Sequence, residues 1–258
     1  MRRIAFTRGV PESIHDCQLT HQTRRTIDLD RARSQHAAYE AALATLGCEI
    51  RRLPDEPEMP DSVFVEDTAV LFDEIAVITR PGAVVRRREI ETVEAALRPF
   101  RELEAMQAPA TLDGGDVLVV GRDVFVGLTG RTNANAVEQL GSILAPHGHR
   151  VRGAPVEGCL HLKSAVTSLG DRAVLVNPDW VDARLFDGIE CVLVDPSEPD
   201  AANGLRIDDA FLHPTAFPRT ADRVRTFGLR VVPIDLSELA KAEGAITCCS
   251  LLLRVLAD

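Results

Sequence analysis

The sequence predicts an α/β protein built from repeated units, as in a propeller or another closed repeat architecture. Two short apolar strands flank a polar turn, and a helix and a further strand follow. This pattern recurs four times, and a C-terminal strand can join the N-terminal strand to complete a fifth unit. Self-similar units of this length favour a repeat fold over a Rossmann sheet, and no G-x-G-x-x-G glycine pattern is present.

The first elements lead into the repeat. A strand is expected at residues 4–7, followed by a polar loop over residues 9–26, a length at which loops often act as lids. Asp28 can cap a helix over residues 29–46, and Gly47 can end that helix. A strand over residues 49–53 and an acidic, proline-rich connection over residues 54–62 follow.

The four internal units then repeat the same order. Their hairpins are expected at residues 68–72 with 75–79, 116–120 with 124–127, 164–169 with 173–176, and 205–207 with 210–213. Their helices are expected at residues 88–100, 133–144, 181–186 and 220–227, and their outer strands at residues 150–152, 191–194 and 229–234. The closing unit pairs a strand around Cys248 with the strand around Ile4.

Composition limits the possible partners. With 45% hydrophobic and 4% aromatic residues, one domain over residues 1–258 can build a core of Val, Leu, Ile and Ala. The net charge of −10 argues against a nucleic-acid or anionic-membrane partner and favours a small cationic one. No stretch resembles a signal peptide or reaches the roughly 20 apolar residues of a spanning helix, so a cytoplasmic location is expected.

The six cysteines are expected to be reduced. They are Cys17, Cys48, Cys159, Cys191, Cys248 and Cys249, and they contain no C-x-x-C pair. A trans peptide holds neighbouring Cα atoms ~3.8 Å apart, which is shorter than a relaxed disulfide prefers. The adjacent Cys248 and Cys249 should therefore both carry thiols.

Polar residues recur where the units begin, at Asp61, Glu66, Asp67, Asp113, Asp116, His161 and Cys248. If the units circle an axis, residues that occupy the same position in each unit, which we call equal-phase residues, converge at the centre of the ring. A thiol, an imidazole and a carboxylate are the parts of a cysteine nucleophile with an oriented acid–base group. Asp61, Glu66 and Asp67 lie around the apolar triplet Val63-Phe64-Val65. Carboxylates beside a buried apolar triplet would be costly unless they meet a cation, and a planar guanidinium matches several carboxylates at once.

Each of these residues also has a purely structural interpretation. Cys248 could be a small buried strand residue, and Cys249, which would face the other side of the strand, keeps that interpretation. His161 lies between two leucines and could be a core histidine, and the carboxylates could form a solvated loop. No metal site is expected, because the histidines and Cys17 lack zinc-site spacing.

Six motifs taken together resemble the dimethylarginine dimethylaminohydrolase family. They are Pro60-Asp61-Ser62-Val63-Phe64-Val65-Glu66-Asp67, Ile78-Thr79-Arg80-Pro81-Gly82, Leu112-Asp113-Gly114-Gly115-Asp116-Val117, Arg131-Thr132-Asn133, Leu160-His161-Leu162-Lys163 and Thr247-Cys248-Cys249-Ser250. Their order over nearly the whole chain makes the combination specific. The resemblance implies the fold of the guanidino-group modifying (pentein) superfamily, a five-bladed ββαβ propeller with an active site in its central channel.

The resemblance also implies roles for individual residues. Cys248 would be the nucleophile, His161 the general acid–base and Asp113 its orienting partner, a position where the family has Glu or Asp. The implied substrate contacts are Asp67 as the guanidinium clamp, Asp61, Phe64 and Glu66 beside it, Arg86 and Arg131 on the amino-acid carboxylate, and the backbone of Leu19 and Ala242.

The implied activity is hydrolysis of N-omega-methylated arginine, asymmetric dimethylarginine or monomethylarginine, to citrulline and an amine through a covalent thiouronium intermediate. This dimethylargininase chemistry needs no metal and no organic cofactor. An arginine deiminase or another guanidino-modifying enzyme is the nearest alternative, and a non-catalytic binder of arginine derivatives is the alternative from another class. The preferred methylation state and the assembly, monomer or homodimer, stay open.

Overall fold

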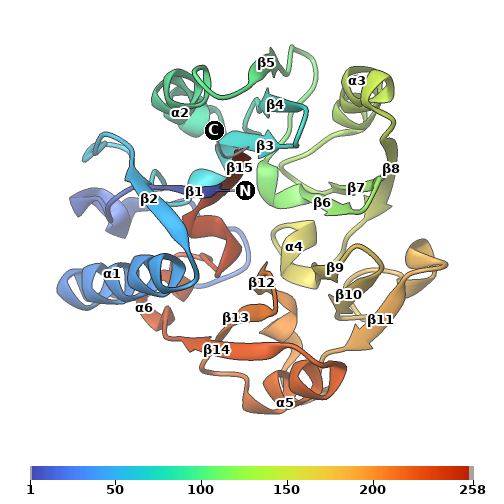
Figure 1. Ribbon diagram of the computed structural model, residues 1–258. Helices are drawn as coiled ribbons and strands as arrows, with labels where there is room; N and C mark the ends of the chain where they lie inside the picture. Colours follow the sequence, from blue (N-terminus) through green and yellow to red (C-terminus); the bar gives the residue numbers. More distant parts are fainter. Residues whose placement is uncertain (1, 256–258) are drawn as a thin grey trace.

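The computed structural model describes residues 2–255, and in it five three-stranded sheets form a ring (Figure 1). From the axis outward the sheets are β15 (Leu251–Val255), β1 (Arg2–Thr7), β2 (Cys48–Arg52); β3 (Ala69–Leu71), β4 (Ile75–Ile78), β5 (Glu102–Ala105); and β6 (Val117–Val120), β7 (Asp123–Leu128), β8 (Arg150–Pro155). The last two are β9 (Val166–Gly170), β10 (Ala173–Val176), β11 (Glu190–Leu193); and β12 (Leu205–Ile207), β13 (Ala210–Pro214), β14 (Arg230–Ile234).

All five sheets share one topology. The middle strand pairs antiparallel with the inner strand and parallel with the outer strand. A parallel pair needs a crossover connection, and helices on the rim of the ring supply it. These are α1 (Leu29–Thr45), α2 (Ile90–Leu97), α3 (Ala134–Leu144), the 3₁₀ helix η6 (Ala183–Phe186) and α5 (Pro218–Phe227). The predicted five-bladed ββαβ propeller is confirmed, including the unit that joins the two ends of the chain.

A short helical turn precedes each inner strand. These turns are η2 (Val65–Thr68), η4 (Gly114–Asp116), α4 (Leu162–Ala165), η7 (Pro199–Ala202) and η8 (Thr247–Cys249). Because the inner strands lie nearest the axis, the turns and the residues just before them gather around the centre of the ring (Figure 1). The equal-phase positions identified in the sequence therefore lie around one centre. The remaining short helices are η1 (Glu12–Asp16), η3 (Val84–Glu89), η5 (Ala145–His147) and α6 (Ser237–Ala240).

Some local predictions were wrong, and one strand was missed. Cys248 does not lie on a strand but in η8, a turn in which Cys248 N donates to Ala245 O at 3.2 Å. Residues 164–165 end α4 instead of beginning a strand, since Ser164 N donates to His161 O at 2.9 Å. Strand β5 was missed because its Glu-Leu-Glu-Ala sequence forms a mostly exposed sheet edge without an apolar run.

The prediction for the first helix is confirmed. Asp28 accepts a hydrogen bond from Arg31 N at 3.0 Å and so satisfies one of the unpaired amides at the helix start. Gly47 follows the helix with φ of 84°, a left-handed conformation that glycine adopts at little cost.

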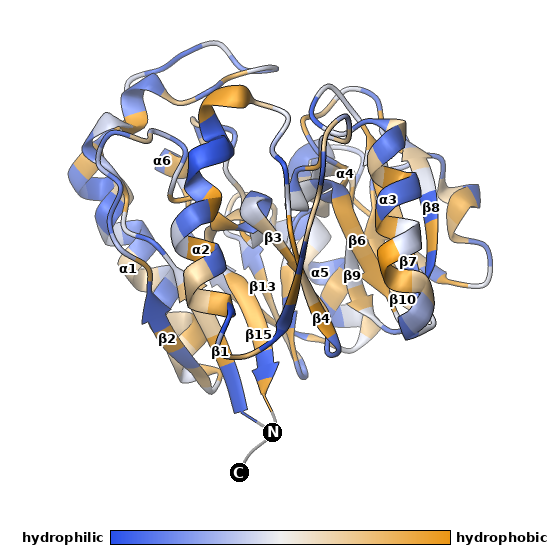
Figure 2. Cartoon of the chain, turned by 90° about the horizontal axis from the view of Figure 1, so that it is seen from above, coloured by the Kyte–Doolittle hydropathy of each residue, from blue (hydrophilic) through white to orange (hydrophobic). Residues whose placement is uncertain are grey.

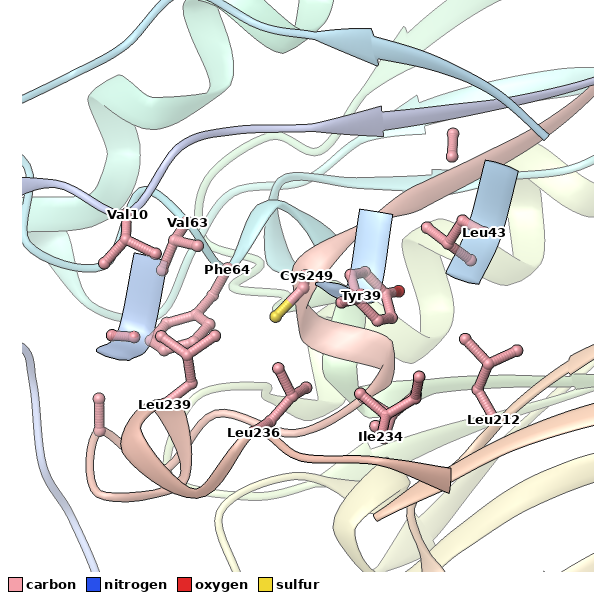
Figure 3. Close-up of a cluster of buried hydrophobic side chains, with 14 of the residues drawn as sticks. Val10, Tyr39, Leu43, Val63, Phe64, Leu212, Ile234, Leu236, Leu239 and Cys249 are labelled. Carbon is pink, nitrogen blue, oxygen red and sulfur yellow. The ribbon is translucent and has the colours of Figure 1, made fainter. Parts of the chain in front are cut away.

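The hydrophobic core is divided among the contacts between neighbouring sheets. One cluster packs α1 against the C-terminal segments and includes Tyr39, Leu43, Leu239 and Cys249 (Figure 3). Strands β6 and β9 are largely hydrophobic, whereas the outer helices α2 and α3 carry hydrophilic residues beside hydrophobic ones (Figure 2). All six cysteines are free. Within residues 2–255, no helix combines the length and the hydrophobicity that crossing a bilayer requires.

Candidate active site

A small pocket lies at the centre of the ring, where the segments before the inner strands meet. It is lined by Gln18, Asp61, Phe64, Asp67, Arg86, Arg131, Leu160, His161, Ala242, Glu243 and Cys248. The thiol and the imidazole expected to act together therefore share one pocket, although 87 positions separate them in the sequence. A wider hollow shares Arg131 and Leu160 with this pocket and is also lined by Thr20 and His21 of the N-terminal loop.

His161 is held between two buried carboxylates. Its Nε2 lies 3.1 Å from Asp113 Oδ2, and its Nδ1 lies 3.9 Å from Asp67 Oδ1. Asp113 is itself oriented, because its Oδ1 accepts a hydrogen bond from Gly82 N at 2.9 Å. Asp113 lies behind the imidazole and outside the pocket lining, which is the geometry of an orienting partner.

Three buried carboxylates favour the charged form of His161. Burial opposes that charge, but Asp67, Asp116 and Asp113 outweigh it and raise the pKa of His161 to about 9. At neutral pH the imidazole is therefore protonated, and it has a proton to donate to a leaving group in the pocket.

Cys248 is half-buried and faces the pocket as a thiol. Burial raises the pKa of Cys248 well above its ordinary value, and the negative charges of Glu66 and Asp67 raise it further. Cys249 is completely buried, belongs to the hydrophobic cluster that includes Tyr39 and Leu239, and keeps its structural interpretation (Figure 3). The two neighbouring thiols thus have different surroundings.

Asp67 provides the pocket with a fixed negative charge. Burial opposes ionisation, but His161 and Arg86 lower the pKa of Asp67 to about 2. Its Oδ1 accepts from Gly115 N at 3.0 Å and its Oδ2 from Arg86 Nη1 at 2.6 Å. A Cβ atom on Gly115 would lie 2.7 Å from His161 Nδ1 and 2.9 Å from Asp67 Oδ1, so only glycine allows this approach.

The two predicted carboxylate-binding arginines differ in their surroundings. Arg86 is buried and pairs with Asp67 and with Glu89, whose Oε2 lies 2.8 Å from Nη2, and it also donates to Phe64 O. Within residues 2–255, the Arg131 guanidinium makes longer contacts, at 3.3 Å to Thr20 Oγ1 and 3.9 Å to Asp113 Oδ2. Arg131 therefore has more hydrogen-bonding capacity left for a ligand, while contact of either arginine with a substrate carboxylate stays a prediction.

The other predicted contact residues divide into two groups. Asp61, Phe64 and Ala242 line the pocket, and Asp61 accepts from Gln18 N at 3.1 and 3.2 Å. Leu19 and Glu66 are not among the described lining residues: Leu19 packs against the hydrophobic cluster, and Glu66 pairs with Lys163 and Thr247. Substrate contact stays a prediction for all five.

Sequence reasoning missed Gln18, Leu160 and Glu243. The carboxylate of Glu243 accepts hydrogen bonds from the consecutive backbone amides of Thr20, His21 and Gln22 at 2.6–3.1 Å and holds the N-terminal loop beside the pocket. Glu243 has φ of 59°, which is uncommon outside glycine, so no sequence pattern indicated this conformation.

Asp67, Asp113 and His161 also place one ligand atom each within 4.8 Å of one another, a spacing that could hold a metal ion. The oxygens of both carboxylates already face donors: the amides of Gly115 and Gly82, the Arg86 guanidinium and the His161 ring. A cationic arginine and a protonated imidazole disfavour a divalent cation in the same place. An acid–base role explains this cluster better.

Comparisons with known proteins point to one family. A family model described as N,N dimethylarginine dimethylhydrolase, eukaryotic, matches residues 11–184. The N(G),N(G)-dimethylarginine dimethylaminohydrolase of Streptomyces coelicolor is 41% identical over 242 residues, which cover 93% of each chain. The enzyme of the same name from Pseudomonas aeruginosa is 35% identical over 226 residues, covering 87% of this chain and 89% of that protein.

This chain belongs to the dimethylarginine dimethylaminohydrolase family. Its structure agrees: DDAH from Pseudomonas aeruginosa, in a cysteine-to-serine mutant complexed with citrulline, matches with a TM-score of 0.93 and 33% identity over 98% of this chain and 100% of that chain. The N-terminal domain of ArgZ, a cyanobacterial arginine dihydrolase, matches with a TM-score of 0.88 at 17% identity over 98% of this chain and 97% of that chain. The second likeness shows only the shared fold.

Membership in the dimethylarginine dimethylaminohydrolase family confirms the resemblance that the six motifs indicated. A further solved structure of this family is an adduct with S-methyl-L-thiocitrulline, with a TM-score of 0.93 to this chain and 33% identity, covering 98% of this chain and 100% of that chain. The ligand named for that structure is an arginine analogue altered at the guanidino end.

Proposed function

We propose that this chain hydrolyses N-omega-methylated arginine to citrulline and methylamine or dimethylamine, with Cys248 as the nucleophile. The observation that carries the proposal is that Cys248, His161 and the ionised Asp67 line one small pocket. The names of the bacterial relatives, which align over most of their length, support the same substrate class.

The proposed orientation of the substrate follows from charge. The guanidinium cation enters beside Asp67 and Asp61, two of the three carboxylates in the pocket lining. The third, Glu243, already accepts from the backbone amides of the N-terminal loop. The α-carboxylate points to Arg131, whose present contacts are long. The α-ammonium group lies near the backbone of Ala242 and of Leu19 in the N-terminal loop, which Glu243 and Asp61 hold through backbone amides.

The first half-reaction breaks the carbon–nitrogen bond. The bound guanidinium lowers the pKa of Cys248, which releases its proton to solvent, and the thiolate attacks the central guanidinium carbon. The tetrahedral adduct then collapses while His161 donates its proton to the departing amine nitrogen. Amine leaves, and an S-alkylthiouronium joins Cys248 to the rest of the substrate.

The second half-reaction consumes one water molecule. His161, now neutral, takes a proton from this water, and the resulting hydroxide attacks the thiouronium carbon. The carbon–sulfur bond breaks, Cys248 leaves as thiolate, and loss of the hydroxyl proton completes citrulline. His161 is again protonated, and Cys248 regains a proton from solvent before the next cycle.

The raised pKa of Cys248 predicts selective alkylation. A chloroacetamidine-type reagent carries the cationic amidine that the pocket should attract, whereas iodoacetamide is neutral. We expect the cationic reagent to alkylate Cys248 at least about tenfold faster, after correction for reactivity toward a small thiol, because each pKa unit changes the thiolate fraction tenfold. Mass spectrometry of the labelled peptide measures both rates, and equal corrected rates would contradict the proposed pocket electrostatics.

A product-release assay tests the function itself. Asymmetric dimethylarginine, monomethylarginine, arginine and agmatine are supplied separately, and citrulline, amines and ammonia are quantified. We expect amine and citrulline from the methylated arginines and little ammonia from arginine. Preferential ammonia release from arginine would favour a deiminase, and measurable binding without any product would favour a non-catalytic binder.

We also propose that residues 1–258 act as one catalytic domain on a small cationic amino acid. A cytoplasmic location and function without metal or organic cofactor stay predictions of the sequence.

A further inference from the structure

Glu66 lies behind the pocket with both carboxylate oxygens engaged. Its Oε1 accepts from Lys163 Nζ at 2.6 Å, and its Oε2 accepts from the Thr247 hydroxyl at 2.6 Å. Glu66 is 6% exposed and Thr247 5%, so water competes little for these hydrogen bonds. Both contacts join segments far apart in the sequence, at separations of 97 and 181 residues.

The partners of Glu66 are the immediate neighbours of the reacting groups. Glu66 precedes Asp67 in η2, Thr247 precedes Cys248 in η8, and Lys163 follows His161 by two residues in α4. One carboxylate thus connects the three short turns that present the guanidinium clamp, the nucleophile and the acid–base group. We call Lys163, Glu66, Thr247 and Asn203 the clamp cluster.

Asn203 completes the clamp cluster from the sheet of β12, β13 and β14, which contributes none of the predicted site residues. Its Nδ2 donates to the Thr247 hydroxyl and to Lys163 O, both at 3.0 Å, and its Oδ1 accepts from Thr247 N at 3.1 Å. Asn203 directly follows η7, which places it at the equal-phase position ahead of β12. The side-chain hydroxyl of Thr247 therefore uses its donor on Glu66 and its acceptor on Asn203.

We propose that Glu66 is a positioning residue that, through Lys163 and Thr247, fixes Cys248 and His161 relative to each other, and that it does not bind substrate. This inference rests on the proposed function and reassigns a residue that the family resemblance places among the substrate contacts. Glu66 lies outside the pocket lining and each of its oxygens already accepts from a protein donor, so it is poorly placed to bind a guanidinium in the pocket. Correct alignment of reacting atoms changes the rate of the chemical step rather than substrate affinity.

The charge of Lys163 has a second consequence. Glu66 is one of the charges that raise the pKa of Cys248, and the ammonium group of Lys163 offsets that charge. Removing the negative charge at position 66 should make the thiol more acidic, whereas removing the positive charge at position 163 should make it less acidic. If alignment matters, turnover falls in both variants although thiol acidity moves in opposite directions.

Glu66→Gln, Lys163→Met, Thr247→Val and Thr247→Ser test the inference. Glutamine has one side-chain acceptor for two donors, methionine and valine each remove one donor, and serine keeps the hydroxyl. We expect the first three to lower kcat by about 10- to 100-fold with KM changed less than about threefold, and Thr247→Ser to stay close to the wild-type kcat. Glu66→Gln should also accelerate alkylation of Cys248 by iodoacetamide, while Lys163→Met slows it.

Glu40→Gln is the matched control. Glu40 is also 6% exposed and accepts from a threonine hydroxyl, Thr7 at 2.7 Å, and from an arginine, Arg52, but it lies outside the pocket lining. We expect Glu40→Gln and Glu66→Gln to lower the melting temperature by similar amounts. Glu40→Gln should not show the loss of kcat expected for Glu66→Gln.

Three outcomes would overturn the inference: a raised KM with unchanged kcat in Glu66→Gln, equal kcat losses in Glu66→Gln and Glu40→Gln, or equal losses in the valine and serine variants at position 247. If the wild-type protein releases no citrulline from methylated arginine, the proposed function fails instead. The alkylation rates of Cys248 then still test the clamp cluster, because Thr247→Val should differ from wild type and Thr247→Ser should not.

Discussion

Cys248→Ser should lower kcat for methylated arginine by on the order of 10⁴- to 10⁶-fold, the range seen when a covalent nucleophile is removed. A serine hydroxyl ionises far less readily than a thiol, and the carboxylates of Asp67 and Glu66 beside position 248 oppose an alkoxide further. Substrate binding should survive, since serine is slightly smaller and keeps the pocket open. Stopped-time citrulline assays measure kcat, and isothermal titration measures the remaining affinity.

Cys249→Ser is the control that separates chemistry from packing. Cys249 has the same side chain one residue further along, but it is completely buried in the cluster around Tyr39 and Leu239. Burying a hydroxyl there should cost about 1–3 kcal/mol of stability, while kcat per folded molecule stays close to wild type. Equal losses of kcat at both positions would mean that the wrong thiol is assigned or that the effect comes from packing.

His161→Gln should lower kcat by about 10²- to 10⁴-fold, because glutamine can accept from or donate to its neighbours but cannot protonate the leaving amine. His213→Gln is the control, since His213 is also buried and bonds Ala201 O at 2.8 Å but lies outside the pocket lining. It should affect the melting temperature more than kcat. Comparable kcat losses in His161→Gln and His213→Gln would contradict the assignment of His161 as the acid–base group.

The pH dependence of kcat/KM provides the second readout for His161. The reactive pair is a thiolate with an imidazolium, so the pair must lose one proton in total. In the free protein that proton leaves with an apparent pKa of about 9, which is the pKa of His161. Burial lowers this pKa, but Asp67, Asp116 and Asp113 together raise it to that value. Since the pKa of Cys248 is higher still, kcat/KM should rise with pH toward about 9 and then level off.

In His161→Gln the titration near 9 should disappear, and the rising limb should move toward the higher pKa of Cys248. A wild-type kcat/KM that falls steadily between about pH 7 and 9 would contradict the protonation states assigned to the pair. Denaturation must be excluded at each pH by the recovery of activity after return to neutral pH.

The sequence indicated the architecture because each repeated unit produces short-range patterns of apolar and turn-forming residues. Hairpin, helix and strand recur with local apolar runs and turn residues, and Asp28 and Gly47 mark the ends of α1 directly. The exposed strand β5 shows the limit of this reasoning, since its pairing with β4 is set by backbone hydrogen bonds along a mostly exposed edge.

The candidate site was predictable in part for the same reason. In a closed ring, residues at the same position of each unit lie near one axis. The sequence alone therefore predicted that Asp67, Asp113, His161 and Cys248 lie close together. The position before β12 obeys the same rule, and Asn203 could have been found there. The amide side chain of Asn203 has no acid–base or nucleophilic function, so its position in the repeat did not lead to a prediction.

What the amino-acid sequence determined by itself was the number of units, the way the two ends of the chain close the ring, and which residues point to guanidino chemistry. Only the tertiary structure decided how those residues are used: that Arg86 pairs with Asp67, that Glu66 joins Lys163 and Thr247, and that Glu243 holds the N-terminal loop. The physical reason is that these polar groups meet across separations of 19 to 223 residues, where packing between units, and not local propensity, sets the distances.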